Sequence, residues 1–317
     1  MIRYFKHDTT PAGTYSIDYF TFDFLLLCTE AQLQFTFLSV IERYSSSCPE
    51  FQHFQSNKFG YPKEIYQFSS VHIEISESRA YQFSPDAQFQ KRASYKLSLS
   101  FNPNKAGDDA LVKDLFFSLE IFLGVIGFRC RRCDFTFDIR EKIENVYILS
   151  RKTESNWKST RYYGVRENSG YLRVYDKREE IKQKEKKDIG EDVTRLEWEM
   201  RNEKEFSFDT FSIPDFSGLD GTARFLMEVP PERIQHALRL VSRPTAAKIR
   251  KKCFTPYPFE PERFQALYDA YMSFYGIPTI KLKCEKAQSD IALENSRFTF
   301  TWDEDIVNKY KEESLQE

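Results

Sequence analysis

The stretch that decides the fold reads Phe128-Arg-Cys-Arg-Arg-Cys-Asp-Phe-Thr-Phe-Asp138. Its second half alternates carboxylate or hydroxyl side chains with phenylalanines. Side chains two positions apart in a β-strand share one face. Asp134, Thr136 and Asp138 are therefore predicted to line one face, with the phenylalanines on the other. The stretch is predicted to be a strand with one polar and one apolar side.

The same alternation recurs in Thr194-Arg-Leu-Glu-Trp-Glu-Met-Arg201, which would place Arg195, Glu197 and Glu199 on one face. Between the two stretches lies a tyrosine-rich segment, Tyr171-Leu-Arg-Val-Tyr-Asp-Lys177. Two carboxylate-bearing strands beside a tyrosine-rich strand predict a cation site with phenols nearby.

The candidate metal ligands are four carboxylates, Asp134, Asp138, Glu197 and Glu199. Hard oxygen donors suit Mg²⁺ or Mn²⁺. The four histidines lie far apart and form no His-x-His pair, which argues against a histidine metal site or a Ser-His-Asp triad.

A simpler interpretation is that these carboxylates pair across strands with arginines on a solvent-facing sheet. The candidate partners are Arg131, Arg173 and Arg195. Charged residues are common on such faces, so spacing alone favours this interpretation.

Composition excludes a global electrostatic attraction to DNA or membranes, because the 317-residue chain has a net charge of −2. Any such binding must come from a local patch. No apolar run is long enough to span a bilayer, so no membrane association is expected. Six irregularly spaced cysteines do not indicate a disulfide framework, and a reducing cytoplasm is the expected compartment.

The pattern of elements predicts an α+β fold, with antiparallel β-sheets carrying the active site, flanking helices and a helical C-terminal part. Strands are expected at 16–24, 71–76 and 95–101, and helices at 108–127, 219–228, 231–242 and 260–275. The corresponding parts of the chain are 1–127 (sheet plus helix), 128–218 (catalytic sheet) and 219–317 (helical).

Three further stretches carry predictions about local structure. The Ser- and Gln-rich region after residue 44 is expected to be loop, and the charged run 177–192 is expected to be a solvated loop or helix rim. Phe20-Thr-Phe-Asp-Phe24 and Phe135-Thr-Phe-Asp-Ile139 hint at a duplicated sheet unit.

A basic cluster without any acidic residue from 233 to 252 is the candidate DNA-binding patch. Its members are Arg239, Arg243, Lys248, Arg250, Lys251 and Lys252. Such a cluster can neutralise phosphates, although base readout does not follow from it. The alternative is a solubilising helix end.

The ordered motifs Arg-x-Cys-Asp-x-x-x-Asp, Tyr-x-Gly, Arg-x-Tyr-Asp-Lys and Thr-Arg-x-Glu-x-x-x-Arg, over roughly residues 130–206, resemble the replication initiation factor family. That family comprises rolling-circle plasmid initiators of the staphylococcal type, related relaxases and filamentous-phage replication proteins. The resemblance implies a cytoplasmic, metal-dependent endonuclease that binds double-stranded origin DNA and nicks one strand at a single-stranded hairpin. It would stay attached through a tyrosine. A homodimer and a host helicase partner are also implied, as is a role for Arg195 and Lys177 in holding the scissile phosphate or offsetting the carboxylates.

One position departs from the family pattern. The nucleophilic tyrosine is expected in the segment that here reads Asn202-Glu-Lys-Glu-Phe206, and phenylalanine has no hydroxyl to attack a phosphodiester. The change could be engineered, another tyrosine could serve (Tyr175 and Tyr163 are nearest), or the chain could be a non-catalytic DNA-binding regulator. A relaxase that starts conjugative transfer is a further alternative.

Overall fold

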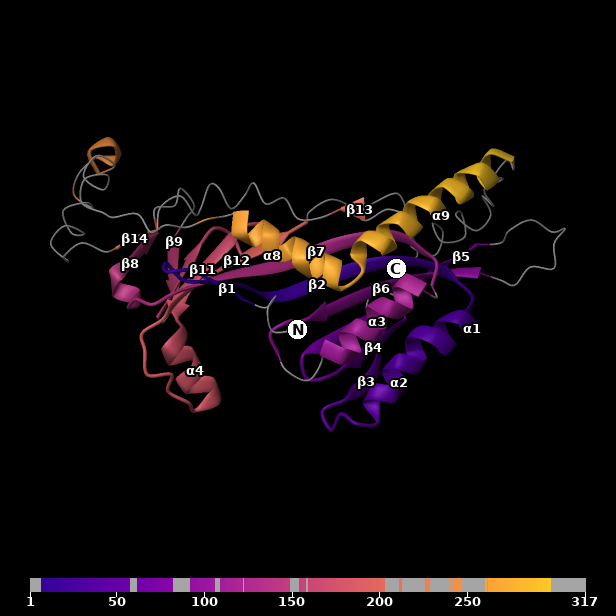
Figure 1. Cartoon of the computed structure of the whole chain (residues 1–317), viewed down its shortest axis with the longest axis horizontal. Coiled ribbons are helices and arrows are strands. Elements are labelled where there is room, and N and C mark those ends of the chain that lie inside the picture. Colours follow the sequence, from indigo (N-terminus) through magenta and orange to yellow (C-terminus); the bar gives the residue numbers. More distant parts are fainter. Residues whose placement is uncertain are drawn as a thin grey trace, which may run out of the picture.

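The computed structural model describes residues 7–57, 62–81, 92–105, 109–121, 123–148, 154–157, 159–202, 211–212, 226–228, 240, 242–246, 260 and 262–297. Within these residues, a twelve-stranded sheet, antiparallel except for one short strand, forms the centre of the molecule. Helices pack across one face of this sheet (Figure 1). This confirms the α+β class expected from the sequence.

The strands alternate with turns and helices along the whole described chain. Their bounds are β1 His7–Thr9, β2 Thr14–Cys28, β3 Gln52–Ser56, β4 Lys63–Gln67, β5 Val71–Tyr81, β6 Arg92–Phe101, β7 Val125–Ile139, β8 Val146–Ile148, β9 Glu154–Trp157, β10 Thr160–Tyr163, β11 Tyr171–Asp176, β12 Thr194–Arg201, β13 Phe211–Ser212 and β14 Leu226–Glu228.

Helical segments join or follow the strands. They are α1 Glu30–Leu33, the π-helical η2 Gln34–Leu38, α2 Ser39–Ser45, α3 Asp109–Ile121, the 3₁₀ turn η4 Ile143–Asn145, α4 Lys177–Glu185, α8 Glu262–Phe274 and α9 Ile277–Arg297. Thr29 starts the first of these with a capping box, in which Thr29 and Gln32 satisfy each other's backbone N–H groups.

The sheet consists of two halves with the same topology. Its main strand order is β3-β4-β5-β6-β2-β7-β12-β11-β10-β9. In each half a long strand (β2 or β7) is followed by four further strands of this sheet, and the last of them pairs with the long strand; β8, which lies between β7 and β9 in the chain, belongs to a separate two-stranded sheet. The sheet therefore runs without a break across the boundary near residue 127.

The register between β2 and β7 repeats when the two strands are exchanged. Phe22 pairs with Cys130, and Phe137 pairs with Tyr15; likewise Asp23 pairs with Arg129, and Asp138 with Thr14. The short repeat Phe-Thr-Phe-Asp in the two strands thus occupies equivalent places. The topology supports the duplicated sheet unit at which the sequence hints.

Aromatic side chains on the covered face hold the helices to the sheet. Phe22 on β2 packs edge-on against Phe116 of α3, with ring centroids 5.5 Å apart. Phe264 of α8 contacts Phe135 of β7 and Trp198 of β12, at 4.8 and 5.8 Å. All five side chains are fully or almost fully buried. Each such burial contributes roughly 1.5–3 kcal/mol to folding.

Two local predictions are wrong, and a third, the helix at 108–127, is confirmed except for its end. The helix expected at 108–127 ends at Ile121 and β7 begins at Val125, because the chain passes close to β2 at Gly124. There Leu27 N–H donates to the Gly124 carbonyl at 2.7 Å, and a Cβ would lie 2.6 Å from the Leu27 carbonyl oxygen. Strand β14 occupies part of the helix expected at 219–228 and pairs with β8.

The expected loop after residue 44 contains the strands β3 and β4. Strand β3 lies at the edge of the sheet and is almost entirely exposed, so both of its faces are polar and the usual alternation is missing. The charged run that starts at residue 177 forms α4, capped by Asp176, which accepts from the backbone N–H of Glu179. The helix expected at 260–275 is confirmed as α8.

None of the described helices is both long and apolar enough to cross a membrane.

Candidate functional site

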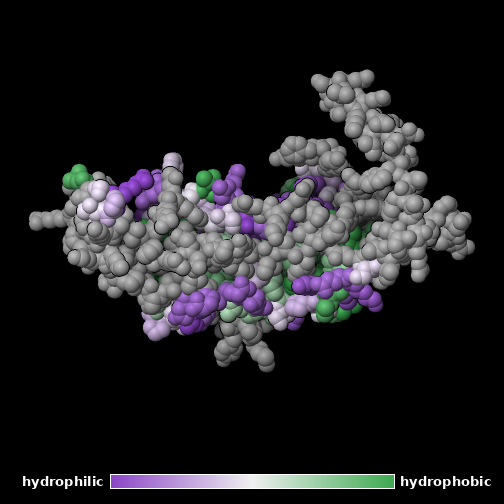
Figure 2. All heavy atoms as spheres, turned by 90° about the horizontal axis from the view of Figure 1, so that it is seen from above, coloured by the Kyte–Doolittle hydropathy of each residue, from purple (hydrophilic) through white to green (hydrophobic). Residues whose placement is uncertain are grey.

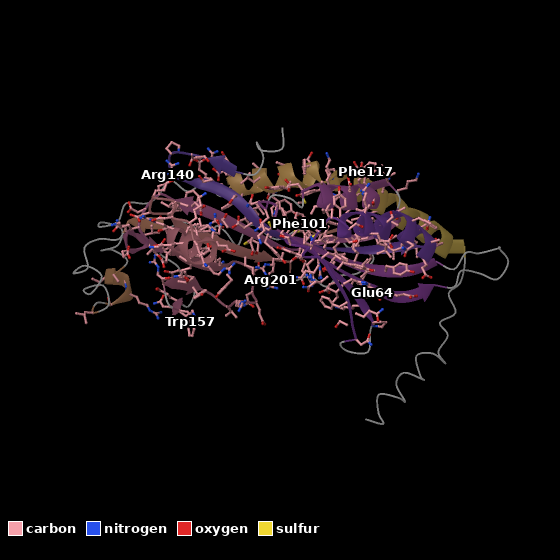
Figure 3. All side chains as sticks on the ribbon, turned by 90° about the horizontal axis from the view of Figure 1, so that it is seen from below. Glu64, Phe101, Phe117, Arg140, Trp157 and Arg201 are labelled. Atoms are coloured by element: carbon pink, nitrogen blue, oxygen red, sulfur yellow. The ribbon has the colours of Figure 1, made fainter. Side chains whose placement is uncertain are left out.

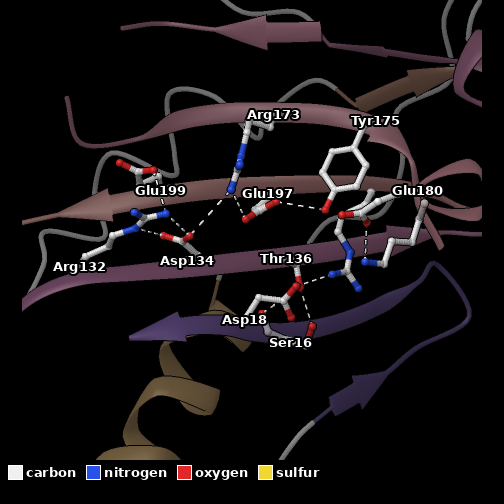
Figure 4. Close-up of polar contacts among 12 residues, drawn as sticks. Ser16, Asp18, Arg132, Asp134, Thr136, Arg173, Tyr175, Glu180, Glu197 and Glu199 are labelled. Atoms are coloured by element: carbon white, nitrogen blue, oxygen red, sulfur yellow. Dashed lines mark hydrogen bonds and ion pairs between the residues drawn. The ribbon is translucent and has the colours of Figure 1, made fainter. Parts of the chain in front are cut away.

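The predicted carboxylates share one face of the sheet, on the side away from α3, α8 and α9; this side is called the polar face below. In the register between β7 and β12, Asp138 lies opposite Arg195, Thr136 opposite Glu197 and Asp134 opposite Glu199. Directly opposed residues of antiparallel strands point to the same side. Figure 4 shows these side chains together with those of β11.

The simpler interpretation supposed that this face is open to solvent. At these positions the polar face is instead buried. Asp134 is 2% exposed and Glu199 is 4% exposed, and Thr136 is completely buried. A buried charge is costly unless it is paired. Each of these carboxylates therefore needs a partner, and arginines provide it.

Arg195 joins two strands through a pair of aspartates. Its Nε and Nη2 each donate to Asp138 at 2.6 Å, in a bidentate arrangement, and its Nη1 bonds Asp18. Burial lowers the pKa of Arg195, but the hydrogen bonds and charge of Asp138 outweigh it and leave that pKa raised. Asn104 donates to the other oxygen of Asp18 at 2.7 Å. Arg195 is thus a permanent cation committed to two carboxylates.

Arg132 forms the second pair of contacts. Its guanidinium donates to both oxygens of Asp134, at 2.8 and 2.6 Å, and lies 3.0 Å from Glu199. Glu199 also accepts from Arg201. Burial raises the pKa of Asp134, although the Arg132 hydrogen bond opposes this effect.

The third contact set contains a tyrosine, a base and a residue that orients the base. Tyr175 Oη donates to Glu197 Oε2 at 3.1 Å, and Arg173 bonds Glu197 Oε1. Arg173 is also 3.9 Å from Asp134, which connects this set to the Arg132 pairs (Figure 4). Burial raises the pKa of Glu197 despite the charge of Arg173. Burial, followed by the charge of Glu197, also raises the pKa of Tyr175.

The Tyr175 hydroxyl, the Glu197 carboxylate and the Arg173 guanidinium thus form a series of a donor, its acceptor and a group that orients the acceptor. A nucleophile hydrogen-bonded to a base, which is itself held by a third group, is the general pattern of nucleophilic catalysis. Tyr175 is half-buried, and the raised pKa of Glu197 makes that carboxylate a better proton acceptor.

The other predicted catalytic residues lie in different surroundings. Lys177 donates to Glu180 at 2.6 Å at the start of α4. Tyr163 pairs with Leu172 in the sheet and therefore points to the helix-covered face, where it is 2% exposed. The structure does not bring Tyr163 to the carboxylates.

Other predicted positions fall mainly outside the described residues. Phe206 lies outside them, as do five members of the basic patch, Arg239, Lys248, Arg250, Lys251 and Lys252. Arg243 is described and is exposed.

The four carboxylates do not form a cation site as they are arranged. Within the described part of the chain, no group of three or more His, Cys, Asp or Glu side chains could hold a metal ion. The Asp134 and Glu199 carboxylates are bridged by Arg132, which would have to move aside before a cation could bind both. The Mg²⁺ or Mn²⁺ expectation stays a prediction, and no chemical step below depends on it.

The sequence did not reveal the roles of Asp18 and Arg132, and it assigned to Arg131 a pairing that the structure gives to Arg132. Asp18 sits at a bulge between Ile17 and Tyr19, which strand alternation cannot reveal. Arg132 carries the pairing that was expected of Arg131. Arg131 instead lies 3.6 Å from the buried Asp23 in the other half of the sheet.

No protein-family model matches the chain. A 142-residue stretch is 27% identical to a replication initiation protein of Staphylococcus aureus. Part of this chain is similar to a replication initiator. The match covers 40% of this chain and 44% of the relative, so the chain matches less than half of that protein's length. The similarity to a replication initiation protein is consistent with the family resemblance of the ordered motifs.

Proposed function

We propose that the protein initiates replication of a plasmid or phage by nicking one strand of its origin, with Tyr175 as the nucleophile. The observation that carries the proposal is the Tyr175–Glu197 hydrogen bond of 3.1 Å, beside the motif-bearing strands. The partial similarity to a replication initiation protein supports the biological process.

The raised pKa of Tyr175 favours an attack in which the hydroxyl loses its proton as the new bond forms. A preformed phenolate is disfavoured by burial and by the neighbouring Glu197 charge. Proton transfer to Glu197 therefore accompanies attack of Tyr175 Oη on the phosphorus. A phosphotyrosyl bond forms, the bond from phosphorus to one sugar oxygen breaks, and that oxygen leaves as a hydroxyl after taking a proton from solvent. Reversal of these steps would rejoin the strand.

The surrounding cations act mainly by positioning. Arg173 holds Glu197 Oε1, so that Oε2 faces the tyrosine. Arg195 is bound by Asp138 and Asp18, which suits it to offset carboxylates rather than to hold a phosphate. Lys177 would have to leave Glu180 to contact the scissile phosphate.

The proposed function also implies a DNA substrate and protein partners. The DNA would be a double-stranded origin with a single-stranded hairpin at the nick site, and a homodimer and a host helicase would complete the reaction. The basic cluster that includes Arg243 is proposed to contact phosphates.

The test uses supercoiled DNA from the replicon that encodes the chain, incubated with protein in Mg²⁺, in Mn²⁺ and in EDTA. Nicking and a covalent protein–DNA adduct are expected, and Tyr175→Phe should abolish both. The matched control is Tyr66→Phe, on β4 in the other half of the sheet and opposite His53. It should retain activity.

Three other outcomes would redirect the proposal. An unchanged adduct in Tyr175→Phe would assign the attack to another residue. Adduct formation only after Phe206→Tyr would place the nucleophile at position 206. Tight origin binding without any adduct would favour a non-catalytic DNA-binding regulator, and activity confined to transfer origins would favour a relaxase.

A further inference from the structure

A diagonal row of aromatic rings crosses the polar face from its outer edge toward the arginine–carboxylate network. Trp157 lies on the edge strand β9 opposite Thr160, Tyr162 lies on β10 opposite Arg173, and Tyr171 lies on β11 opposite Glu199. Each ring is therefore two positions along from the partner of the previous one. Such diagonal neighbours on one face are about 7–8 Å apart, which is within reach of aromatic side chains.

The inner part of this row is a stacked pair. The rings of Tyr162 and Tyr171 are nearly parallel, with an interplanar angle of 13° and centroids 6.0 Å apart. Tyr171 is buried, whereas Tyr162 is partly exposed. The buried ring of Tyr171 therefore supports the more exposed ring of Tyr162.

The outer member of the row is open to solvent. Trp157 is 69% exposed. In Figure 3 it lies at the edge of the sheet, on the side away from the helix that carries Phe117. Among the residues that Figure 2 colours by hydropathy, hydrophilic ones predominate in the view from above, with separate hydrophobic ones among them. A single exposed aromatic residue is common, but this exposed indole occupies the next diagonal position outward from a tyrosine that is itself supported by a second ring.

Positive charge accompanies the rings. Arg173, whose guanidinium holds Glu197, lies directly opposite Tyr162 on the same face and adds positive charge beside that ring. Arg166, in the turn after β10, is exposed and close enough to influence Tyr171 electrostatically. Flat aromatic faces for bases with nearby cations for phosphates are the recurrent features of single-strand binding surfaces.

We propose that Trp157 and Tyr162, the latter supported by Tyr171, form a stacking platform for unpaired bases of single-stranded DNA beside the Tyr175–Glu197 pair. This inference rests on the proposed function, because it names the side chains that would hold the unpaired strand of the proposed origin beside the same site. A base can lie flat on an exposed ring only when it is unpaired and free to leave its neighbours. The platform would therefore favour an opened strand over a duplex.

The first experiment measures binding of the full chain to a fluorescein-labelled oligothymidine of about twelve nucleotides, within the usual span of a single-strand binding surface. Fluorescence anisotropy is recorded for this single strand and for a duplex of the same length. Trp157→Ala and Tyr162→Ala should each weaken single-strand binding by about tenfold, whereas Trp157→Phe should stay within about threefold of the wild type. Duplex binding should not change.

The matched control is Val165→Ala, which removes an equally exposed apolar side chain (62%) from the turn beyond β10. It should bind like the wild type. Unchanged single-strand binding in both aromatic variants would overturn the platform. Equal weakening of single-strand and duplex binding would also overturn it. So would sedimentation data in which Trp157→Ala changes only the self-association of the protein and not its binding to DNA.

A second measurement separates this inference from nicking itself. The same variants are tested for adduct formation on an origin oligonucleotide that is already single-stranded. Trp157-dependent binding without any adduct would support the platform and contradict the nicking proposal. Adduct formation with the same KM in wild type and Trp157→Ala would support nicking and contradict the platform.

Discussion

Tyr175 Oη lies 3.1 Å from Glu197 Oε2, and the other oxygen of Glu197 is held by Arg173. The hydroxyl and its acceptor come from adjacent strands, β11 and β12, with Glu197 directly opposite Arg173 in the register. The sheet itself therefore sets the distance between the candidate nucleophile and its base, without help from a loop.

Replacing that base should reduce nicking while leaving DNA binding intact. Glu197→Gln keeps a hydrogen-bond acceptor for Tyr175 but cannot take its proton, so the nicking rate should fall by about 10²–10⁴. Glu64→Gln is the control, because Glu64 lies on β4 in the other half of the sheet and pairs with His53 rather than with the tyrosine. Single-turnover cleavage of a labelled origin measures both. Equal losses in the two variants would contradict the role of Glu197.

The pH dependence of nicking should reflect the raised pKa of Glu197. Only the ionised carboxylate accepts a proton, so the rate should rise with pH as Glu197 deprotonates. Burial raises its pKa above the ordinary glutamate value of 4.5, and the loss of activity on acidification should therefore begin at a higher pH than for an ordinary glutamate. A rate profile that is flat down to pH 4.5 would refute this assignment.

Arg195 should be essential for stability. Arg195→Met leaves the carboxylates of Asp138 and Asp18 without their cation, and loss of one partner of a buried ion pair costs about 3–5 kcal/mol. Arg140→Met is the control, because its side chain is 75% exposed and its pair with Glu191 lies at the surface; it should cost less than about 1 kcal/mol. Urea unfolding gives both free energies. A small loss of unfolding free energy in Arg195→Met would contradict this prediction. It would mean that water solvates the Asp138 and Asp18 carboxylates once their cation is removed.

Phe264 should hold α8 to the second half of the sheet. Phe264→Ala removes the ring that packs on Phe135 and Trp198, and such large-to-small changes cost about 3–5 kcal/mol. The exposed Phe117→Ala, on the outer side of α3, should cost far less. Thermal unfolding of both variants checks this. Similar melting temperatures would show that the packing of α8 contributes little.

Glu74 should make stability fall in acid. The hydrogen bond from His72, opposed by burial and aided by Lys63, lowers the pKa of Glu74 to about 2 from an ordinary 4.5. Its stabilising contribution is therefore complete above pH 4.5 and is lost as the pH falls toward 2. Because the side chain is one-third exposed, the contribution is about 1 kcal/mol. Glu74→Gln should lose it at pH 7 and show a shallower decline between these values in urea unfolding. An unchanged decline would exclude Glu74 as its source.

Alternation in the sequence was sufficient to predict most of the polar face. Asp134 and Asp138, together with Glu197 and Glu199, share one side of the sheet because strand side chains alternate with a period of two. The same rule could not choose between the neighbours Tyr162 and Tyr163, since one of any adjacent pair must point each way. The pairing of Tyr162 with Arg173 places Tyr162 on the polar face and Tyr163 on the opposite face.

The sequence by itself determined the amphipathic strands, the α8 helix and the set of carboxylates, because these depend on local periodicity. Only the tertiary structure decided which charge neutralises which. A bulge brings Asp18 to Arg195, and the register places Arg173 beside Glu197 and Glu197 beside Tyr175. These contacts join residues far apart in the chain, and no local pattern encodes the register of one strand against another. The physical reason is that burial forces each charge to find a partner in space, whatever its distance in sequence.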